Sequence, residues 1–297
     1  MSDGVFVFGA GGRLGASIVQ QFGDRRVIPH THASLDITDH AAVMKAVQAA
    51  VPAVIVNCAA FNRVDDAEDR PLDAFAINAL AVRTLARAAE AVEAVFVHYG
   101  SDFVFDGDAV EPYDENARPS PRSTYGLSKL LGEWLALDAP RGFVLRVESL
   151  FGSAPGWQGR PGSLDQIVNA LEEGRTAQVF TDRVVSPSYV DDVARATKHL
   201  IDADAEPGLY HCVNSGLATW HEVAQEAARV LAVAPRLHPI TVDSCALKAQ
   251  RPRFCALANR KLAAAGFPMP SWQDALARWL SARESGVRQG TIDGVHG

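Results

Sequence analysis

The sequence has little of what several classes of protein require. Only 4 of its 297 residues are cysteines, and none forms a CxxC pair, so we expect neither a disulfide framework nor a cysteine-rich zinc site. It lacks a run of roughly eighteen apolar residues that could cross a bilayer. The N-terminus has no basic segment typical of a signal peptide. We therefore expect a cytoplasmic protein with no membrane partner.

A surplus of basic residues is also missing. Lys and Arg number 28 against 35 Asp and Glu, which gives a formal net charge of −7. Proteins that bind nucleic acid displace counterions with basic side chains, so this balance argues against a nucleic-acid partner. The nine histidines show no HExxH spacing. Although His30 and His32 flank Thr31, we predict no metal site.

Short apolar runs alternate with helical patterns in the first half of the chain. The predicted strands are 5–8, 26–28, 53–57, 94–98 and 143–147, and the predicted helices are 14–22, 41–50, 73–91 and 124–137. Uninterrupted Val, Ile and Phe runs separated by helices are typical of a parallel sheet covered on both faces. We therefore predict an α/β fold with a Rossmann-like doubly wound parallel sheet, whose ligands bind at the carboxyl ends of the strands.

Gly9, Gly12 and Gly15 form a GxxGxxG turn between the first predicted strand and the following helix. Glycine permits positive φ and lets the backbone approach a pyrophosphate, whose charge faces the helix N-terminus. The commoner GxGxxG spacing fails because Leu14 occupies its third glycine position. Such turns also serve tight strand–helix connections, but after the first strand of a parallel pattern this one predicts dinucleotide binding.

The end of the second predicted strand lacks the carboxylate that usually holds the ribose diol of NAD. Pro29–His32 stands there instead. Arg13 lies inside the glycine turn, where its guanidinium suits a 2′-phosphate, and a solvated side chain is the competing interpretation. We therefore expect NADP(H) to be the preferred cofactor and NAD(H) to be the alternative.

The pattern changes after Phe151. Gly152–Gly162 is rich in Gly, Pro and Ser, as expected of a loop over a site, and a last amphipathic helix is predicted over 272–282. The segments between them mix short helices and strands into a smaller α/β lobe. The expected divisions are an NAD(P)-binding Rossmann domain over 1–150 with a return segment near 178–201, a substrate-binding lobe over 151–177 and 202–285, and a flexible tail over 286–297.

Tyr125 and Lys129 are four residues apart and therefore share one face of a helix. A free tyrosine titrates near ~10, and an ammonium one turn away lowers that pKa, which suits a proton donor or base. A YxxxK pair is often only a surface pair. Here it follows a strand that ends near Ser101, whose hydroxyl could share charge on a carbonyl oxygen. We predict that Ser101, Tyr125 and Lys129 form a catalytic triad.

An ordered set of motifs carries a resemblance to a known family. The motifs are Leu35–Asp39, Val56–Phe61 leading to Val64–Asp65, Asp102–Gly107, Pro112–Glu115, Tyr125–Lys129 with Gly132–Glu133, Ser186–Tyr189, Gly208–His211 and Arg251–Pro252. Through them the chain resembles an extended short-chain dehydrogenase/reductase, and most of all the dTDP-4-dehydrorhamnose reductase family. The set spans nearly the whole chain, so it is more specific than any single motif.

The resemblance implies roles for matching residues. The cofactor contacts would be Gly9, Gly11, Gly12, Arg13, Leu14, Gly15, Thr31, Asp36, Ile37, Ala59, Ala60, Phe61, Asn78, Tyr125 and Lys129. The substrate contacts would be Asp102, Phe103, Ser149, Arg183, Arg251 and Arg253, with the arginines as candidates for a diphosphate. Ordinary core packing is the competing interpretation of the apolar contacts, and solvated surface that of each arginine.

Three stretches depart from the family pattern. Gly100–Phe103 replaces Ser-Thr-Asp-Tyr, Arg146–Ser149 replaces Arg-Thr-Ser-Trp, and Gly162–Ser163 replaces Asn-Phe, which removes aromatic surface. The resemblance implies an NADPH-dependent reductase of a 4-keto-6-deoxy nucleotide sugar, with hydride passing to C4 and a proton coming from Tyr125. An NAD-dependent nucleotide-sugar epimerase and a non-catalytic NADP-binding regulatory subunit are the alternatives. A homodimer is the assembly that the resemblance implies.

Overall fold

The core of the molecule is a parallel sheet of six strands. The computed structural model describes residues 3–154 and 156–293. In spatial order the strands are β10 (Gly208–His211), β5 (Gly142–Val147), β4 (Val95–Ser101), β3 (Val54–Asn57), β1 (Val5–Phe8) and β2 (Val27–His30), with every neighbouring pair parallel. The strand order reverses between β1 and β3, so the predicted Rossmann-like doubly wound sheet is confirmed.

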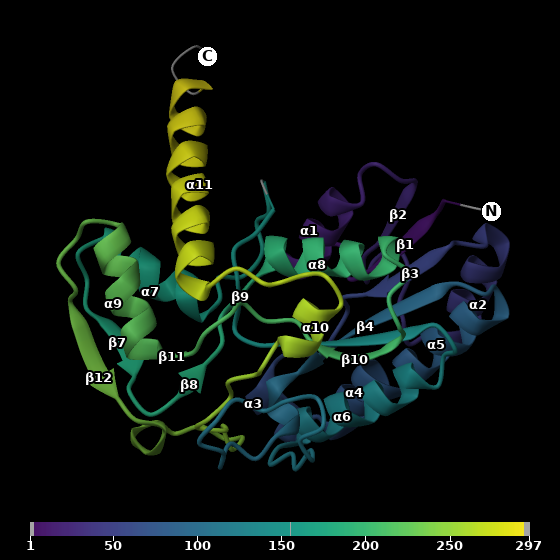
Figure 1. Cartoon of the computed structure of the whole chain (residues 1–297), viewed down its shortest axis with the longest axis horizontal. Coiled ribbons are helices and arrows are strands. Elements are labelled where there is room, and N and C mark those ends of the chain that lie inside the picture. The colour runs from purple at the N-terminus through teal and green to yellow at the C-terminus, as the bar shows by residue number, and fades with distance from the viewer. Residues whose placement is uncertain (1–2, 155, 294–297) are drawn as a thin grey trace.

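Helices cover both faces of this sheet (Figure 1). One face carries α1 (Arg13–Gln21) and α8 (Val190–Asp202), and the other carries α2 (His40–Ala50), α5 (Ala81–Ala91) and α6 (Thr124–Leu137). Val5 and Val7 belong to the core on the first face, whereas Phe6 and Phe8 belong to the core on the second. Because side chains alternate along a strand, a sheet buried on both faces requires such uninterrupted apolar runs.

The helix predicted over 73–91 is interrupted by a π-helical turn. The short helix α3 (Val64–Asp69) is followed by α4 (Pro71–Phe75), by a π-helical turn, η1 (Ala76–Leu80), and then by α5. Asn78 is buried in the π turn. Turns of this kind inside helices frequently lie at functional sites, because the extra residue redirects one side chain.

The second lobe is built from short elements (Figure 1). Its strands form three pairs, which are β6 (Leu150–Phe151) with β9 (Ser188–Tyr189), β7 (Ala177–Phe180) with β12 (Leu237–Ile240), and β8 (Val184–Val185) with β11 (Ala218–Thr219). Its helices are α7 (Ser163–Glu172), α9 (Trp220–Val230), α10 (Arg260–Ala264) and α11 (Trp272–Asp293). The 3-10 turns η2 (Asp102–Val104) and η3 (Val242–Ser244) complete the described elements.

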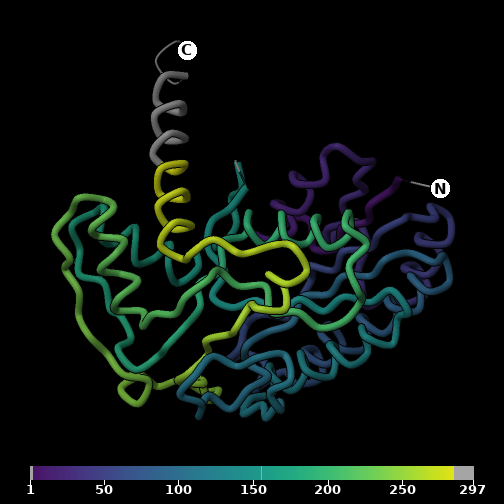
Figure 2. The backbone as a smooth tube through the Cα atoms, viewed as in Figure 1, coloured from purple at the N-terminus to yellow at the C-terminus, as the bar shows by residue number. Residues whose placement is uncertain are grey.

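The boundary between the lobes differs from the predicted one in two places. β10 lies within the expected substrate lobe in sequence, yet it pairs with β5 as the sixth strand of the main sheet. Within the expected return segment, β7 pairs with β12 of the second lobe, and α8 is the part that returns to the sheet. Figure 2 shows the chain between β12 and α11 passing from the second lobe to the sheet and back. Strand pairing, which depends on distant residues, decided both points.

The last helix is longer than its periodicity indicates. The pattern predicts an end near Ala282, but α11 continues to Asp293, into the segment expected to be a flexible tail. Residues 294–297 of that expected tail lie outside the described part of the chain. Among the described residues, none of the helices combines the length and the apolar character that crossing a bilayer requires.

Candidate active site

A cavity of about 360 Å³ lies at the carboxyl ends of β1, β2 and β3, where the strand order reverses. It brings together many of the predicted cofactor residues, namely Gly9, Gly11, Gly12, Thr31, Asp36, Ile37, Ala59 and Ala60. A Cβ on Gly9, whose φ is +74°, would lie 2.5 Å from the backbone nitrogen of Ala59. A Cβ on Gly15 would collide with the Gly9 carbonyl oxygen. Glycine at both positions keeps this cradle open, and it fits a dinucleotide pyrophosphate at the N-terminus of α1.

We expect Gly9→Ala to weaken NADP binding by at least about tenfold, because the added methyl group would both strain the positive φ and collide with Ala59. Fluorescence titration with NADP measures this loss. Gly174→Ala is the matched control, since Gly174 has a φ of +67° and no described atom lies within 4 Å of the point that an added methyl group would occupy. Equal NADP affinity in Gly9→Ala and the native protein would contradict a close approach of the nucleotide to this turn.

Arg13 does not point into this cavity. Its guanidinium forms an ion pair with Asp165, at 2.5 Å, and donates to the Gly152 carbonyl oxygen. It also lies 4.7 Å from the ring centroid of Trp157, whose Nε1 donates to the Gly11 carbonyl oxygen. Arg13 therefore ties the glycine turn to the second lobe, whereas the sequence predicts a role at a 2′-phosphate.

Three other predicted cofactor residues, Leu14, Phe61 and Asn78, contribute to the packing around the cavity and do not line it. Leu14 is buried in the core that α1 shares with the sheet. The Asn78 amide accepts from the backbone nitrogen of Phe61 at 2.8 Å and donates to its carbonyl oxygen at 3.0 Å. The same amide donates to the hydroxyl of Ser128. The π turn thus fixes the loop after β3 against α6, which carries the predicted tyrosine and lysine.

The first turn of α6 places Tyr125 beside the end of β4. The Ser123 side chain caps the helix by accepting from the Gly126 backbone nitrogen at 3.1 Å. A Cβ on Gly126 would collide with the Phe103 carbonyl oxygen, so glycine lets the helix approach the turn that follows Ser101. The rings of Tyr125 and Phe103 meet edge to face with centroids 5.4 Å apart. The first turn of α6 therefore brings Tyr125 to the turn that follows Ser101.

Burial dominates the electrostatics of the triad. It raises the pKa of Tyr125 to about 12, and a hydrogen bond from Ser101 opposes this rise. Burial also lowers the pKa of Lys129 to about 8. The Lys129 Nζ donates to the Tyr99 carbonyl oxygen at 2.5 Å. The sequence predicts that Lys129 lowers the pKa of Tyr125, but in this arrangement Ser101 is the group that does so.

A buried ion pair behind the triad was not predicted. Glu133, one helical turn after Lys129, accepts from the Ser101 backbone nitrogen at 3.3 Å and pairs with Arg146 on β5 at 2.8 Å. Both charged side chains are at most 3% exposed. A Cβ on Gly100 would collide with the Glu133 carboxylate. The i, i+4, i+8 spacing of tyrosine, lysine and glutamate is the sequence signal that could have found it.

The substrate candidates separate into two groups. Asp102 and Phe103 follow Ser101 directly, and the Arg251 guanidinium lies 5.7 Å from the Phe103 ring centroid. Arg251 pairs with Asp65 through Nη2 at 2.8 Å, while its buried Nη1 has no hydrogen-bond partner among the described residues. Arg253, by contrast, is half exposed and pairs with Asp243. Arg251 therefore keeps one guanidinium nitrogen without a hydrogen-bond partner among the described residues, whereas Arg253 is held by Asp243 at the surface.

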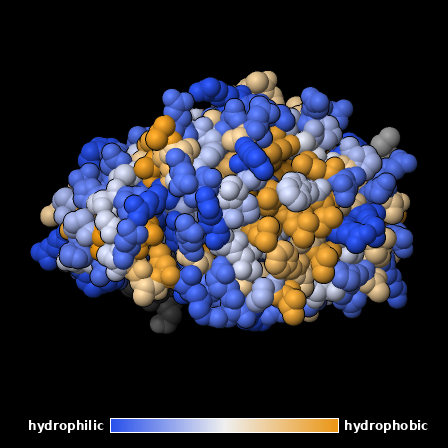
Figure 3. Space-filling model, turned by 90° about the horizontal axis from the view of Figure 1, so that it is seen from below, coloured by the Kyte–Doolittle hydropathy of each residue, from blue (hydrophilic) through white to orange (hydrophobic). Residues whose placement is uncertain are grey.

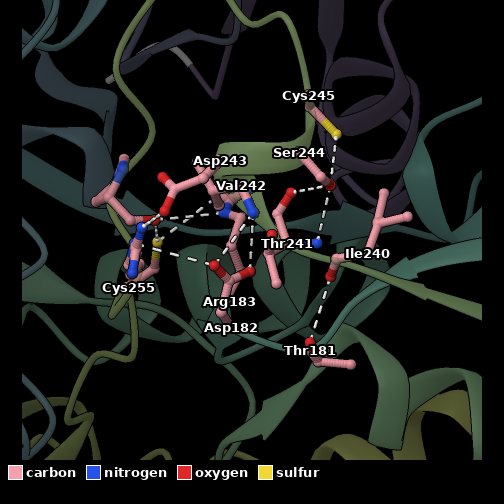
Figure 4. A network of polar contacts seen from close by, with 12 residues as sticks. Thr181, Asp182, Arg183, Ile240, Thr241, Val242, Asp243, Ser244, Cys245 and Cys255 are labelled. Atoms are coloured by element: carbon pink, nitrogen blue, oxygen red, sulfur yellow. Dashed lines mark hydrogen bonds and ion pairs between the residues drawn. The ribbon is translucent and has the colours of Figure 1, made fainter.

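A segment that we call the strap, residues 241–255, holds these arginines in place. The Asp182 carboxylate accepts from the Val242 backbone nitrogen at one end, as Figure 4 shows. Midway along the strap, Lys248 pairs with Asp69 of α3. The Ala249 backbone nitrogen donates to Asp65 nearby. The strap thus links the second lobe to the nucleotide-binding side of the molecule.

Four polar side chains form a buried cluster next to Ser101. Oxygen atoms of Asp102 and Glu148 and the sulfur of Cys255 lie within 4.8 Å of one another, a spacing that could hold a metal ion. The guanidinium of Arg183 lies beside them, with Nη2 3.6 Å from the Cys255 sulfur (Figure 4). Because this fixed positive charge would repel a cation, the cluster is better suited to hydrogen bonding than to a metal. Ser149 follows Glu148 with a φ of +46° and donates to its carboxylate.

Comparison with known proteins agrees with this architecture. The family model of the RmlD substrate binding domain matches residues 3–284. The dTDP-4-dehydrorhamnose reductase of Streptomyces griseus is 36% identical over 287 residues, covering 93% of this chain and 92% of the relative. The solved structure of dTDP-4-dehydrorhamnose reductase from Bacillus anthracis in complex with NADP is 30% identical, has a TM-score of 0.88, and is matched over 95% of this chain and 100% of that chain.

A more distant solved structure shares the fold alone. UDP-glucose 4-epimerase of Thermus thermophilus, in complex with NAD, is 20% identical with a TM-score of 0.77, over 94% of this chain and 98% of that chain. Together, the glycine turn, the cavity and the full-length relatives define an NAD(P)-dependent oxidoreductase of the short-chain dehydrogenase/reductase type. The chain belongs to the RmlD substrate binding domain family, which confirms the resemblance found in its motifs.

Proposed function

We propose that the protein reduces the C4 carbonyl of a 4-keto-6-deoxy nucleotide sugar with NADPH. The observation that carries this proposal is the hydrogen bond between Ser101, at the carboxyl end of β4, and Tyr125 on α6, with Lys129 one turn further along the same helix. The full-length similarity to the Streptomyces griseus reductase supports this class of substrate. The second lobe and the strap, which carries Arg251, are proposed to bind the sugar nucleotide.

NADP(H) is proposed as the preferred cofactor, with NAD(H) as the alternative. The Bacillus anthracis relative was solved with NADP bound. In this chain Thr31 and His32 line the cavity after β2. Asp36, the acidic residue among the described residues that line this cavity, is already occupied, because its carboxylate accepts from the backbone nitrogen and the hydroxyl of Thr38. The preference for NADP(H) therefore rests on the Bacillus anthracis relative and on the absence of a carboxylate from β2.

In the proposed reaction the bound reduced nicotinamide supplies the hydride. Tyr125 delivers a proton to the carbonyl oxygen, and its raised pKa keeps the hydroxyl protonated until then. Ser101 donates a hydrogen bond to the same oxygen and shares its developing charge. The buried ammonium of Lys129 is held in position by the Tyr99 carbonyl oxygen, one helical turn after Tyr125 on α6.

Arg251 is the group that we propose for the diphosphate of the substrate. Its side chain is 13% exposed, and one edge of the guanidinium is already held by Asp65. The other edge, which ends in an Nη1 without a partner among the described residues, remains for a phosphate oxygen. A guanidinium with one edge fixed loses little freedom on binding, so this placement favours a planar contact with an anion.

Purified protein is expected to oxidise NADPH when it is mixed with a 4-keto-6-deoxy nucleotide sugar, and the loss of absorbance of the reduced nicotinamide measures the rate. Sugars without the 4-keto group serve as the control, because they offer no carbonyl for the hydride. An absence of NADPH oxidation across a panel of nucleotide ketosugars would overturn the proposal. Tightly bound NAD in the purified protein, with interconversion of epimers, would instead indicate the epimerase.

A homodimer is proposed through the face that carries α6. Exposed apolar side chains gather on this face in Figure 3, where the molecule is seen from below. The large exposed ones on α4, the π turn and α6 are Leu72, Leu80, Leu127, Trp134 and Leu137. Soluble monomers rarely expose such a contiguous apolar area, and a self-complementary patch across a two-fold axis is the commonest way to cover it.

Trp134→Glu is expected to convert the protein from dimer to monomer in light scattering, because Trp134 is 58% exposed on the helix at the centre of this patch. Leu217→Glu is the matched control, since Leu217 is 45% exposed but lies beside the second lobe. The control protein should keep the mass of the native one. A monomeric native protein would contradict the proposed assembly.

We further propose that the protein acts in the cytoplasm. All four cysteines are free in the structure, including the buried Cys212 and Cys255. Their unpaired state suits a reducing compartment.

A further inference from the structure

The hydroxyl of Ser101 has more partners than it has protons. Its oxygen accepts from the Phe103 backbone nitrogen at 3.2 Å, and it lies 3.0 Å from the Asp102 carboxyl oxygen Oδ1. A serine hydroxyl offers one proton and two lone pairs. If Ser101 donates its proton to an ionised Asp102, none is left for the reacting carbonyl oxygen. If Asp102 is itself protonated and donates, both lone pairs are used, and the Ser101 proton is free for Tyr125 or for the substrate.

Glu148 is the group that can keep Asp102 protonated. Both carboxyls are at most 4% exposed, and they belong to the buried cluster at the ends of β4 and β5. Glu148 accepts from the Ser186 backbone nitrogen at 2.6 Å and from the Ser149 hydroxyl at 3.4 Å, so its oxygens act as acceptors. Arg183 is the cation of the cluster and balances one negative charge. Two buried carboxyls beside one arginine favour one shared proton.

We propose that Asp102 is a positioning residue that carries a proton and donates it as a hydrogen bond to Ser101, and that the ionised Glu148 beside it holds that proton in place. The inference rests on the proposed function for its catalytic consequence. In this arrangement the chain of donors runs from Asp102 through Ser101 to the carbonyl oxygen. Asp102 neither gains nor loses a proton during turnover, since Tyr125 supplies the one that is transferred.

The electrostatics of the pair favour one proton between the two carboxyls, and the 2.6 Å hydrogen bond from the Ser186 nitrogen favours the negative charge on Glu148. Burial raises the pKa of Asp102 to about 6, while Arg183 and the Ser101 hydroxyl oppose the rise. Burial and the charge of Asp102 raise the pKa of Glu148 well above its usual range. The other titratable groups that face the pair are Cys255 from the strap and Tyr125 from α6. The pair therefore loses its shared proton as the pH rises, and Ser101 then turns its own proton towards Asp102.

Asp102→Asn provides the decisive variant, because an amide nitrogen donates to Ser101 at every pH. We expect it to remove the fall in kcat that the native enzyme shows as the pH rises, and to keep kcat above that of Asp102→Ala at every pH. Asp102→Ala, which offers no donor, should lower kcat at least about tenfold at every pH. If Asp102→Asn is as inactive as Asp102→Ala, an ionised Asp102 is required and the proposal is overturned.

Glu148→Gln tests whether the charge of Glu148 holds the proton on Asp102. Without the neighbouring charge, the pKa of Asp102 falls, and we expect the decline in kcat to move to lower pH by about one unit or more while the NADPH dissociation constant stays unchanged. In the Asp102→Asn background the same substitution should have no further effect on the pH profile, because no shared proton remains. An equal shift in both backgrounds would contradict the pairing.

An infrared measurement separates this proposal from the proposed reaction. A protonated carboxyl absorbs at a different infrared frequency from a carboxylate. The native protein, measured with NADP and without sugar, should therefore show a carboxylic acid band that disappears as the pH rises. The band should be missing in Asp102→Asn. Its presence with no turnover of any ketosugar would support the shared proton and reject the reductase, whereas its absence at every pH would overturn the shared proton. Unchanged thermal midpoints verify that the variants are folded.

Discussion

Replacement of Tyr125 by phenylalanine is expected to lower kcat by about a thousandfold, because removing a positioned proton donor costs about 10²–10⁴ in rate. The ring, which packs edge to face on Phe103, stays in place, and only the hydroxyl is lost. The affinity for NADP should change by less than about twofold, since the cavity lies at the ends of other strands. Steady-state rates and a fluorescence titration measure the two quantities separately.

Tyr210→Phe is the control for this substitution. Its hydroxyl donates to the Glu206 carbonyl oxygen at the far edge of the sheet, on β10. Loss of that hydrogen bond should leave kcat unchanged. Full activity in Tyr125→Phe would remove the tyrosine from the mechanism, and a large loss of NADP affinity in that variant would mean that its effect is structural.

Replacement of Arg146 by methionine is expected to lower the free energy of unfolding by about 3–5 kcal/mol, because it leaves the buried charge of Glu133 without its partner. Arg146 donates to Glu133 through Nε and Nη2, and its guanidinium lies 5.0 Å from the Phe105 ring centroid. All of these groups lie inside the sheet domain, where water does not replace the lost contacts. Urea unfolding followed by fluorescence measures the change.

An exposed ion pair gives the matched control. Arg70 and Asp73 are each about half exposed, and Arg70→Met should cost less than about 1 kcal/mol, as surface pairs do. The double variant Glu133→Gln/Arg146→Met removes both buried charges and is expected to recover part of the loss. A loss in Arg146→Met no larger than that in Arg70→Met would contradict the stabilising role of the buried pair.

Local patterns were sufficient for most of the sheet domain. The first and last residues of α6 match the predicted helix over 124–137, because Ser123 caps one end and the apolar pattern stops at the other. β1 matches the predicted strand over 5–8, since both faces of the sheet are covered. β10 could not be assigned in this way, because a short strand at a sheet edge is decided by the pairing partner and not by its own residues.

The sequence indicated some features of the candidate site and missed others. The triad could be proposed from the sequence because Tyr125 and Lys129 have a fixed helical spacing and Ser101 ends a recognisable strand. Arg13 was predicted at the cofactor, yet it pairs with Asp165, which is 152 residues away in sequence. An arginine forms an ion pair with a carboxylate that is close in space, and the local sequence does not indicate where that carboxylate lies.

The sequence by itself therefore determined the glycine turn, the alternation of strands and helices, and the presence of a tyrosine, a lysine and a serine at spacings that suit proton transfer. These features depend on neighbours within one strand or one helical turn. Only the tertiary structure decided that Glu133 pairs with Arg146 and that Asp102, Glu148 and Arg183 share one buried cluster. Such contacts join residues from different strands and from both lobes. The low dielectric around them makes each charge depend on all the others.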